Sequence, residues 1–508
     1  MSFSTQGEGD FAPGPNRTQF AEALSSQISR MDAIIDEHTT TIEAIQNQVV
    51  NLVHNSHGAR CHNIPTPSLL LTSHDTPITT EELATPSARE QTNRPPNDIL
   101  PMHIPVGHGT TTEDLLRTEQ AKGLLCDYPN GIFLITERKR KTPEDMPLHL
   151  GLQVTSSIRL DDQEIHALSR TYFDHVNPKH PILFEEDFKH LIDLTDLQLE
   201  QLDVKGALIY LVFALGAAVQ SSPDCIKCGD LPGNEYFRHA IPVLLREWPV
   251  SFQADLYLCQ ALFLASSWCS IMCWPMQAWR MIHMASTNIQ HAFLAFPPRD
   301  RPASQGLVRL SWAISLVECD LLAEYHLPRS GIENVVERLY YPEYEPVSVD
   351  ALTWLSNLSA RRLMNRVHFT VYNNSSDGHA PYSINSVDQI VDRALLDSGS
   401  SNNLLATSTE LYHQLHQWWG LIPPSVRPDL EDTEPDPNNG TLLLRFWACG
   451  DVIYRPFLYK LCAATPDMAT DSLIDPALHC IRHCRRFLQT AQHLTKTPSP
   501  FTMISLHS

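Results

Sequence analysis

Ala207-Leu-Ile-Tyr-Leu-Val-Phe-Ala-Leu-Gly-Ala-Ala-Val219 contains no charged side chain and no polar break. The helical pattern around it runs from Lys205 to Gln220. A helix that is apolar on every side has to be surrounded by protein, whereas a surface helix keeps one polar face. We therefore predict a fully buried helix over this range, and with it a large helical core.

The segments on both sides of this helix show helical periodicity with clear punctuation. Asp161, followed three residues later by Glu164, resembles a capping box and predicts a helix that runs to about His175, where Asn177-Pro178 ends it. No alternating strand pattern of any length occurs. The sequence predicts an all-α fold with a large multi-helical domain, whose further helices cover Gly233–Arg246, Ala254–Trp268, Pro275–Phe293, Leu307–Tyr325, Thr407–Trp419, Leu442–Leu461 and Ala477–Leu494.

One segment is long and apolar enough to suggest a membrane span. Leu256 to Trp279 contains no charged residue. It does contain glutamine and serine side chains, and Cys273-Trp274-Pro275 divides it into two helices. We expect a buried helical hairpin here and no association with a membrane.

Composition limits the classes of function. The 508 residues include 37 Lys and Arg against 58 Asp and Glu, for a formal net charge of −21. Such an acidic chain does not hold nucleic acid by bulk electrostatics, so any contact with DNA has to come from a local basic module or a partner. Twelve cysteines are too sparse for a disulfide scaffold, and the N-terminus shows no secretory signal, so a reducing compartment is expected.

A heptad pattern occupies residues 20–53. Apolar residues recur at alternating spacings of four and three, which is the signature of a coiled coil. β-Branched residues fill one core position, which favours two parallel strands, while His38 occupies the other core position once. A single amphipathic helix packed on its own domain is the alternative. We predict dimerisation through Leu24, Ile28, Met31, Ile35, Ile42, Ile45, Val49 and Leu52.

Composition divides the rest of the chain. Residues 1–19 and the Pro-, Ser-, Thr- and Asn-rich segment 54–112 are expected to be a disordered terminus and a disordered linker. The helical domain covers 113–495, and 496–508 form a tail. One compact basic run is a candidate nuclear localisation signal or, equally, a solvated helix end: Arg138, Lys139, Arg140 and Lys141.

Several motifs together resemble a known family. Tyr172-Phe173 followed by Val176-Asn-Pro-Lys-His-Pro-Ile-Leu183 resembles the opening of the fungal-specific transcription factor domain, also called the middle homology region. Similar motifs follow in the family's order, at Gln260–Trp268, Pro275–Ala285, Arg309–Ile332, Trp418–Arg427 and Arg445–Tyr459. The resemblance covers about residues 113–495.

The resemblance implies a nuclear regulator of RNA polymerase II transcription, of a metabolic or secondary-metabolite pathway, that acts on the transcription machinery. The family's usual order is a six-cysteine, two-zinc cluster, a linker, a coiled coil and a helical regulatory region. Cys61 and Cys126 are the only cysteines in the first 200 residues, so this chain lacks that cluster. We therefore expect no DNA-binding residue and no cofactor, with zinc present only if a cluster is encoded upstream. DNA would be reached indirectly, as a homodimer or as a heterodimer with a zinc-cluster transcription factor.

Other chemistry is weakly supported by the sequence. Cys225 and Cys228 have the spacing of half a zinc site, but no second pair completes it. His479, Cys480, His483 and Cys484 lie on adjacent helical turns, where core cysteines beside surface histidines are favoured over a soft-metal site. No phosphate loop, nucleophile elbow or Ser/His/Asp grouping occurs, so we expect no catalytic or metal-binding residue and no enzyme. A helical enzyme with a pocket at 256–285 and a scaffold dimer remain as alternatives.

Overall fold

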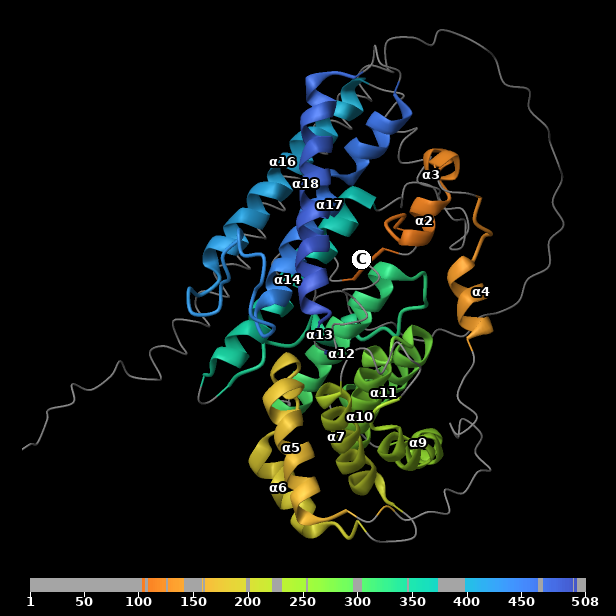
Figure 1. The fold of residues 1–508 in the computed structure, drawn as a ribbon, viewed down its shortest axis with the longest axis vertical. Coiled ribbons are helices and arrows are strands. Elements are labelled where there is room, and N and C mark those ends of the chain that lie inside the picture. The colour runs from red at the N-terminus through yellow and green to blue at the C-terminus, as the bar shows by residue number, and fades with distance from the viewer. Residues whose placement is uncertain are drawn as a thin grey trace, which may run out of the picture.

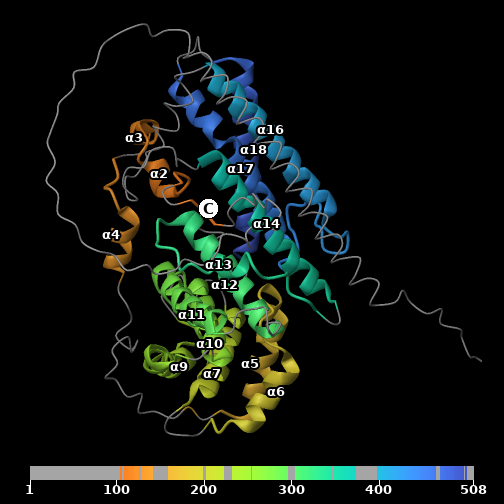
Figure 2. The same ribbon diagram turned by 180° about the vertical axis from the view of Figure 1, so that it is seen from behind.

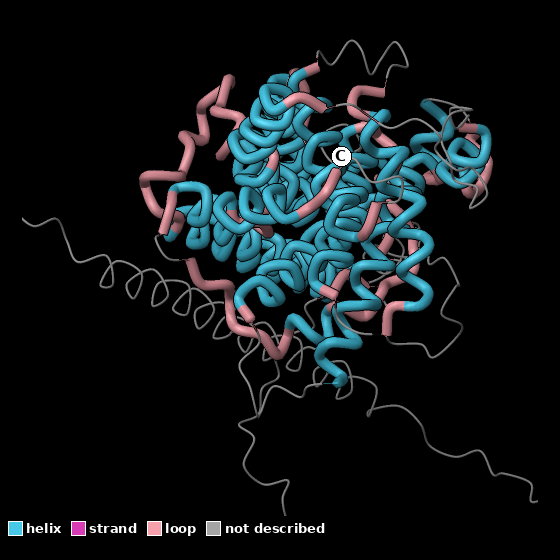
Figure 3. The backbone as a smooth tube through the Cα atoms, turned by 90° about the horizontal axis from the view of Figure 1, so that it is seen from below, coloured by secondary structure: helices cyan, strands magenta, loops and turns pink. Residues whose placement is uncertain are grey.

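A computed structural model describes residues 103–105, 108–124, 127–140, 158, 160–197, 202–221, 231–252, 255–295, 304–344, 347–372, 398–464, 469–496 and 498–499 (Figure 1). Every regular element in these ranges is a helix, as the tube in Figure 3 shows, and no strand occurs within them. The predicted all-α fold is confirmed. The predicted coiled coil at 20–53 and the linker up to residue 102 lie outside the described residues.

A first group of helices, drawn in yellow and green in Figure 1, is built around α7 (Val204–Gln220). The side chain of Asp203 caps α7 by accepting a hydrogen bond from the backbone N–H of Gly206 at 2.8 Å. Every residue from Gly206 to Gly216 is buried, which confirms the predicted core helix. The other members are α5 (Asp162–His175), α6 (Glu185–Leu194), α9 (Asn234–Glu247), α10 (Leu256–Ile271), α11 (Pro275–Ala295) and α12 (Gln305–Glu324).

The close packing of α5 on α7 depends on a glycine. A Cβ atom on Gly216 would lie 3.0 Å from the carbonyl carbon of Leu168 in α5 and closer still to its oxygen. Only a residue without a side chain lets the two backbones approach this closely. The apolar sequence of α7 therefore explains its burial, and Gly216 within it sets the short distance between α7 and α5.

The segment 256–285 forms the predicted helical hairpin. α10 ends at Ile271, and α11 begins at Pro275. Between them Cys273 takes a left-handed backbone with φ of 55°, and the Trp274 N–H donates to the Cys269 carbonyl at 2.8 Å. The two helices pack against each other, and no described helix is long and apolar enough to cross a membrane.

A second group of helices, from teal to blue in Figure 1, has its own hydrophobic core. α17 and α18 pack along each other, and both Figure 1 and Figure 2 show them beside α14 and α16. The core of this group includes Trp418, Phe446 and Phe487. The helices are α14 (Val349–Tyr372), α16 (Ser398–Leu421), α17 (Gly440–Ala463) and α18 (Asp471–Leu494). The short α13 (Glu333–Val336) precedes them and packs on the first core.

Helix α14 joins the two groups. Its residues Trp354 and Leu358 belong to the first core, whereas Leu363 and Val367 belong to the second. A second connection comes from the short 3₁₀ turn η1 (Asn177–Lys179), where the buried ammonium group of Lys179 donates to Asn438 Oδ1 at 3.2 Å. The two helix groups are thus tied together by the apolar side chains of α14 and by the buried hydrogen bond of Lys179.

The N-terminal described segment runs along one side of both helix groups (Figure 2). It contains α2 (Thr112–Leu116), α3 (Glu119–Leu124) and α4 (Ile132–Lys139). We call residues 108–118 the strap. Its first residues, 108–112, were assigned to the linker by composition, but here Thr110 and Thr111 are buried against the helices.

Most predicted helices are present with ends shifted by a few residues. Asp161 caps α5, because its side chain accepts a hydrogen bond from the Glu164 N–H at 2.7 Å. The reciprocal hydrogen bond of a capping box is missing. Glu164 Oε1 accepts a hydrogen bond from the Tyr236 hydroxyl at 2.5 Å instead. The clearest omission is α14, which the sequence analysis did not predict. Its buried face mixes leucine with arginine and asparagine, so it shows no apolar stripe.

Candidate functional site

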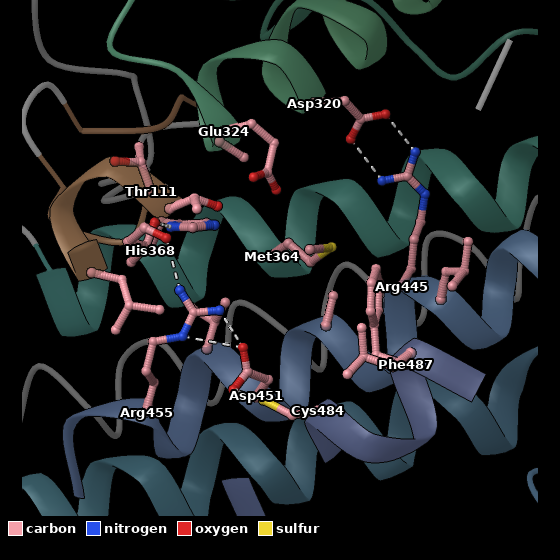
Figure 4. A pocket seen from close by; sticks show the side chains of 18 of the residues that line it. Thr111, Asp320, Glu324, Met364, His368, Arg445, Asp451, Arg455, Cys484 and Phe487 are labelled. Atoms are coloured by element: carbon pink, nitrogen blue, oxygen red, sulfur yellow. Dashed lines mark hydrogen bonds and ion pairs between the residues drawn. The ribbon is translucent and has the colours of Figure 1, made fainter. Parts of the chain in front are cut away.

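A cavity of about 240 Å³ lies where the strap, α12, α14, α17 and α18 meet. This is close to the lower end of the range of ~300–1,000 Å³ that is usual for small-molecule pockets. Figure 4 shows two arginine–aspartate pairs on its wall, with Met364 between them. The wall is therefore apolar in the middle and charged at two places.

The first charged place contains one carboxylate and two guanidinium groups. Arg445 of α17 donates to both oxygens of Asp320, at 2.8 and 2.7 Å, while Arg361 of α14 donates to Asp320 Oδ1 at 3.4 Å. All three side chains are buried, at 2–7% exposure. Burial alone would raise the pKa of Asp320, but Arg445 and Arg361 outweigh it and hold that pKa below its ordinary value. Asp320 is therefore ionised and joins three helices.

Asparagine side chains orient both arginines. Arg445 Nε donates to Asn357 Oδ1 at 2.9 Å, and Arg361 Nε donates to Asn365 Oδ1 at 2.8 Å. Nη2 of Arg361 is buried and has no hydrogen-bond partner. One carboxylate thus faces two cations.

The second charged place connects α17 with the strap. Arg455 pairs with Asp451 one turn earlier in α17, and its Nη1 donates to the carbonyl of Thr110 at 2.7 Å. Asp451 Oδ1 also accepts from the thiols of Cys480 and Cys484 of α18, at 3.0 and 2.9 Å. The pKa of Asp451 lies below its ordinary value because Arg455 and these donors outweigh the effect of burial.

Asp451, Cys480 and Cys484 are also the residues that come nearest to a metal site among those described. Their carboxylate oxygen and two sulfur atoms lie within 4.8 Å of one another. The hydrogen bond with Cys484, burial and the charge of Asp451 all raise the pKa of Cys480, so this thiol stays protonated. A thiolate ligand set would require both protons to leave. With Cys480 protonated, the two thiols of α18 donate hydrogen bonds to the carboxylate of Asp451 and so join α18 to α17.

The histidines next to these cysteines differ from the expectation of surface positions. His483 is 3% exposed and packs against Gly450 of α17, with its ring 5.4 Å from that of Trp447. His479 is half-buried and stacks on Tyr454 at 5.3 Å. The four residues therefore do not converge on one point, because consecutive residues of a helix face different directions.

The strap is fixed by a cluster of buried polar groups. His326 Nε2 lies 2.7 Å from Asp114 Oδ2, and the Thr111 hydroxyl donates to the same oxygen at 2.7 Å. His108 and His368 pack edge to face at 5.2 Å, and burial lowers the pKa of His108 to about 4. Burial also holds the pKa of His368 well below its ordinary value, so His108 and His368 are neutral at neutral pH.

The middle of the cavity is apolar. Met364, Leu444, Ala448 and Phe487 line it between the two charged places. Leu488 is 62% exposed and belongs to the same wall, so an apolar side chain reaches solvent beside the cavity.

Comparison with known families identifies part of the chain. Residues 170–293 match the family model of the fungal-specific transcription factor domain. The matched span covers part of the first helix group and none of the second. No curated protein and no solved structure matches the chain.

The match places the fungal-specific transcription factor domain in the first helix group. The span begins in α5 and ends in α11, and it includes the Tyr172–Leu183 motif. In the structure, Asn177 closes that motif by hydrogen bonds to the backbone of Leu183, with its Nδ2 donating at 3.1 Å. No residue on the cavity wall falls within the matched span. The cavity is therefore a feature of this chain's structure and is not carried over from the family match.

The residues singled out from the sequence lie away from the cavity. The dimerisation residues at 24–52 and Cys225 and Cys228 are outside the described residues. Arg138 and Lys139 occupy the last turn of α4, where Arg140 pairs with Glu137 at 2.6 Å, and Lys141 is not described. Segment 256–285, the alternative enzyme pocket, contributes no residue to the cavity because its side chains fill the first core.

The charged residues of the cavity were not predicted from the sequence. Arg361 and His368 belong to α14, which was not predicted at all, and Asp320, Asp451 and Arg455 were read as parts of ordinary helices. One signal was present: residues 349–372 contain neither glycine nor proline. That absence is compatible with a long helix even where no apolar stripe is visible.

Proposed function

We propose that this chain regulates transcription by RNA polymerase II in the nucleus, with the helical region as the control module. The observation that supports it is the fungal-specific transcription factor domain at 170–293, which belongs to a family of transcription regulators and not to an enzyme family. The domain's helices form the first core and are tied through α14 to the second. We propose that the genes it regulates belong to a metabolic or secondary-metabolite pathway.

The proposed partners follow from the heptad pattern. Residues 20–53 would form a parallel coil with a second copy of the chain or with a zinc-cluster transcription factor, and the assembly would act on the transcription machinery. DNA would be contacted through that partner or through a module encoded upstream, so the zinc of a DNA-binding cluster would be bound there. The basic run at 138–141 is the candidate for nuclear import.

The regulatory role is tested by tethering. The full chain is fused to an unrelated DNA-binding domain and expressed with a reporter gene in a fungal nucleus. We expect reporter output to change by severalfold, upward or downward, relative to the DNA-binding domain alone. The same fusion lacking residues 160–496 should return to the baseline. A full-length fusion that enters the nucleus and leaves the reporter unchanged contradicts the proposal.

The coil is tested by charge substitution at core positions. Ile35→Asp with Ile42→Asp places carboxylates in the predicted interface, and light scattering should then show a monomer. Thr40→Asp with Asn47→Asp adds the same charge on the outer face of the same helix and should leave the dimer intact. If wild-type chain is monomeric, or both double variants behave alike, the coil is excluded.

A further inference from the structure

Two thiols of α18 and one carboxylate of α17 converge beside the cavity. Cys480 and Cys484 lie one helical turn apart, so their side chains project from the same face of α18. Asp451 Oδ1 accepts from both thiols, at 3.0 and 2.9 Å, and the oxygen and two sulfur atoms lie within 4.8 Å of one another. Three atoms of the kinds that bind metals thus face a common point.

The spacing of these atoms is close to that of a zinc site. Zinc binds sulfur at about 2.3 Å and carboxylate oxygen at about 2.0–2.2 Å in tetrahedral geometry, which places its ligand atoms about 3.5–3.8 Å apart. The two oxygen–sulfur distances would therefore lengthen by about 0.5–0.8 Å when a metal enters. Small rotations of the two cysteine side chains supply a change of this size.

Exchange of two protons for one divalent cation leaves the charge of the site unchanged. With both thiols protonated, the negative charge of Asp451 is balanced by that of Arg455. Each sulfur that bonds to the metal releases its proton to solvent, so two protons leave as the two positive charges of the cation arrive. A monovalent cation on the same two thiolates would leave a buried negative charge, which is costly. The site therefore favours a divalent ion.

Arg455 holds the carboxylate in the orientation that a metal requires. Its Nε donates to Asp451 Oδ2 at 3.1 Å, whereas the two thiols contact Oδ1. Oδ1 is therefore directed at the sulfur atoms while Oδ2 stays in the ion pair. Hydrogen bonds of this outer kind orient metal-binding carboxylates. Arg455 also donates to the carbonyl of Thr110, so the outer contacts of the site extend to the strap.

The cavity gives access to the site and room for a fourth ligand. Asp451 and Cys484 line the cavity and lie next to each other in Figure 4, whereas Cys480 is fully buried. A volume of about 240 Å³ has room for water molecules. A water molecule bound from this side would complete a tetrahedron with three protein ligands.

We propose that Asp451, Cys480 and Cys484 bind one Zn²⁺ ion, with a water molecule from the cavity as the fourth ligand. Two thiolates select zinc over Mg²⁺ and Ca²⁺, which prefer oxygen ligands. The ion replaces two hydrogen bonds by three metal–ligand bonds and so fastens α18 to α17. This site is separate from the zinc of a DNA-binding cluster and does not depend on the proposed regulatory function.

Binding is measured on the purified, reduced full-length chain after removal of metal with a chelator. Titration of Zn²⁺ against a fluorescent zinc chelator gives the stoichiometry and the Kd, and Co²⁺ replaces Zn²⁺ for absorption spectroscopy. We expect one site per chain with a Kd of about 10 µM or below. The cobalt spectrum should show the charge-transfer bands of thiolate ligands and the visible bands of tetrahedral coordination.

Two double variants that remove the same number of thiols locate the site. Cys480→Ser with Cys484→Ser keeps hydroxyl donors toward Asp451 but removes both thiolates. Zinc affinity should fall by at least about tenfold, since loss of an outer contact alone costs about 10–100-fold. Cys225→Ser with Cys228→Ser is the matched control, because this pair has the spacing of half a zinc site, and it should bind zinc as the wild type does.

Thermal unfolding gives an independent readout. Saturating Zn²⁺ should raise the melting temperature of the wild type and of the control, because the ion binds the folded chain, and leave that of Cys480→Ser with Cys484→Ser unchanged. Circular dichroism verifies that each variant is folded. If this double variant does not fold, Cys484→Ser alone, at the half-buried position, tests the same loss of affinity.

Three results overturn the proposal. The first is a wild-type Kd weaker than about 10 µM. The second is a cobalt spectrum without thiolate bands. The third is zinc affinity that falls by less than about tenfold in the folded cysteine variants of α18, or that falls equally in the control.

Discussion

Replacing Gly450 by alanine probes the interface of α17 and α18, which forms one side of the cavity. A methyl group built on Gly450 would lie 2.8 Å from Cγ of His483 and closer still to Cδ2 and Nε2. The ring of His483 has little freedom to move, because its Nδ1 donates to the His479 carbonyl at 2.7 Å and its centroid lies 5.6 Å from that of Tyr412. The two helices would have to separate to accommodate the added carbon.

Two opposing effects set the expected magnitude. Overpacking a close-packed interior costs about 1–3 kcal/mol, and contact with a ring fixed on both sides belongs at the upper end. Alanine is about 1 kcal/mol more favourable than glycine in the interior of a helix. We therefore expect Gly450→Ala to lower the free energy of unfolding by about 2 kcal/mol.

Urea and thermal unfolding, followed by circular dichroism, measure this change. Gly420→Ala in α16 is the matched control, because nothing lies within 4 Å of the added carbon, and it should be neutral or slightly stabilising. His483→Ala removes the obstructing ring, so the double variant should be more stable than the sum of the two single losses predicts. A Gly450→Ala protein as stable as the wild type would refute the reasoning.

Three further changes test the charged groups. Asp320→Asn leaves two buried guanidinium ions uncompensated and should cost about 3–5 kcal/mol of unfolding free energy, measured by urea titration; a loss below about 1 kcal/mol contradicts the assigned pair. Burial raises the pKa of Glu318 to about 7, above its unfolded value, so its stabilising contribution is present at acidic pH and is lost as pH rises through about 7. The melting temperature of Glu318→Gln should lack that pH dependence, and an unchanged profile speaks against it. Burial would raise the pKa of Asp114, but the hydrogen bond and charge of His326 outweigh it, so the strap loses stability as pH falls through this lowered pKa. Limited proteolysis should cut the strap faster in Asp114→Asn at neutral pH, and equal rates would exclude this role.

The cavity lies where the strap meets helices of both groups. A change there is felt by the strap through Arg455 and by α12 and α14 through Asp320.

The sequence by itself determined the fold class and the first core. The run from Ala207 to Val219 has no polar face, so it had to be a buried helix wherever it was placed. Local signals also located helix ends, as at Asp161 and at the break before Pro275, because capping and proline geometry act over a few residues. The family resemblance rested on the same local patterns and was confirmed over residues 170–293.

Only the tertiary structure decided the candidate site. Asp320, Arg361 and Arg445 lie on three helices far apart in sequence, and each alone looks like an ordinary charged position. Helix α14 escaped prediction for the same reason, because Arg361 and Asn357 face charged partners on other helices and break the amphipathic period. Periodicity reports which residues avoid water, and it carries no information on which distant charges compensate one another once water is excluded.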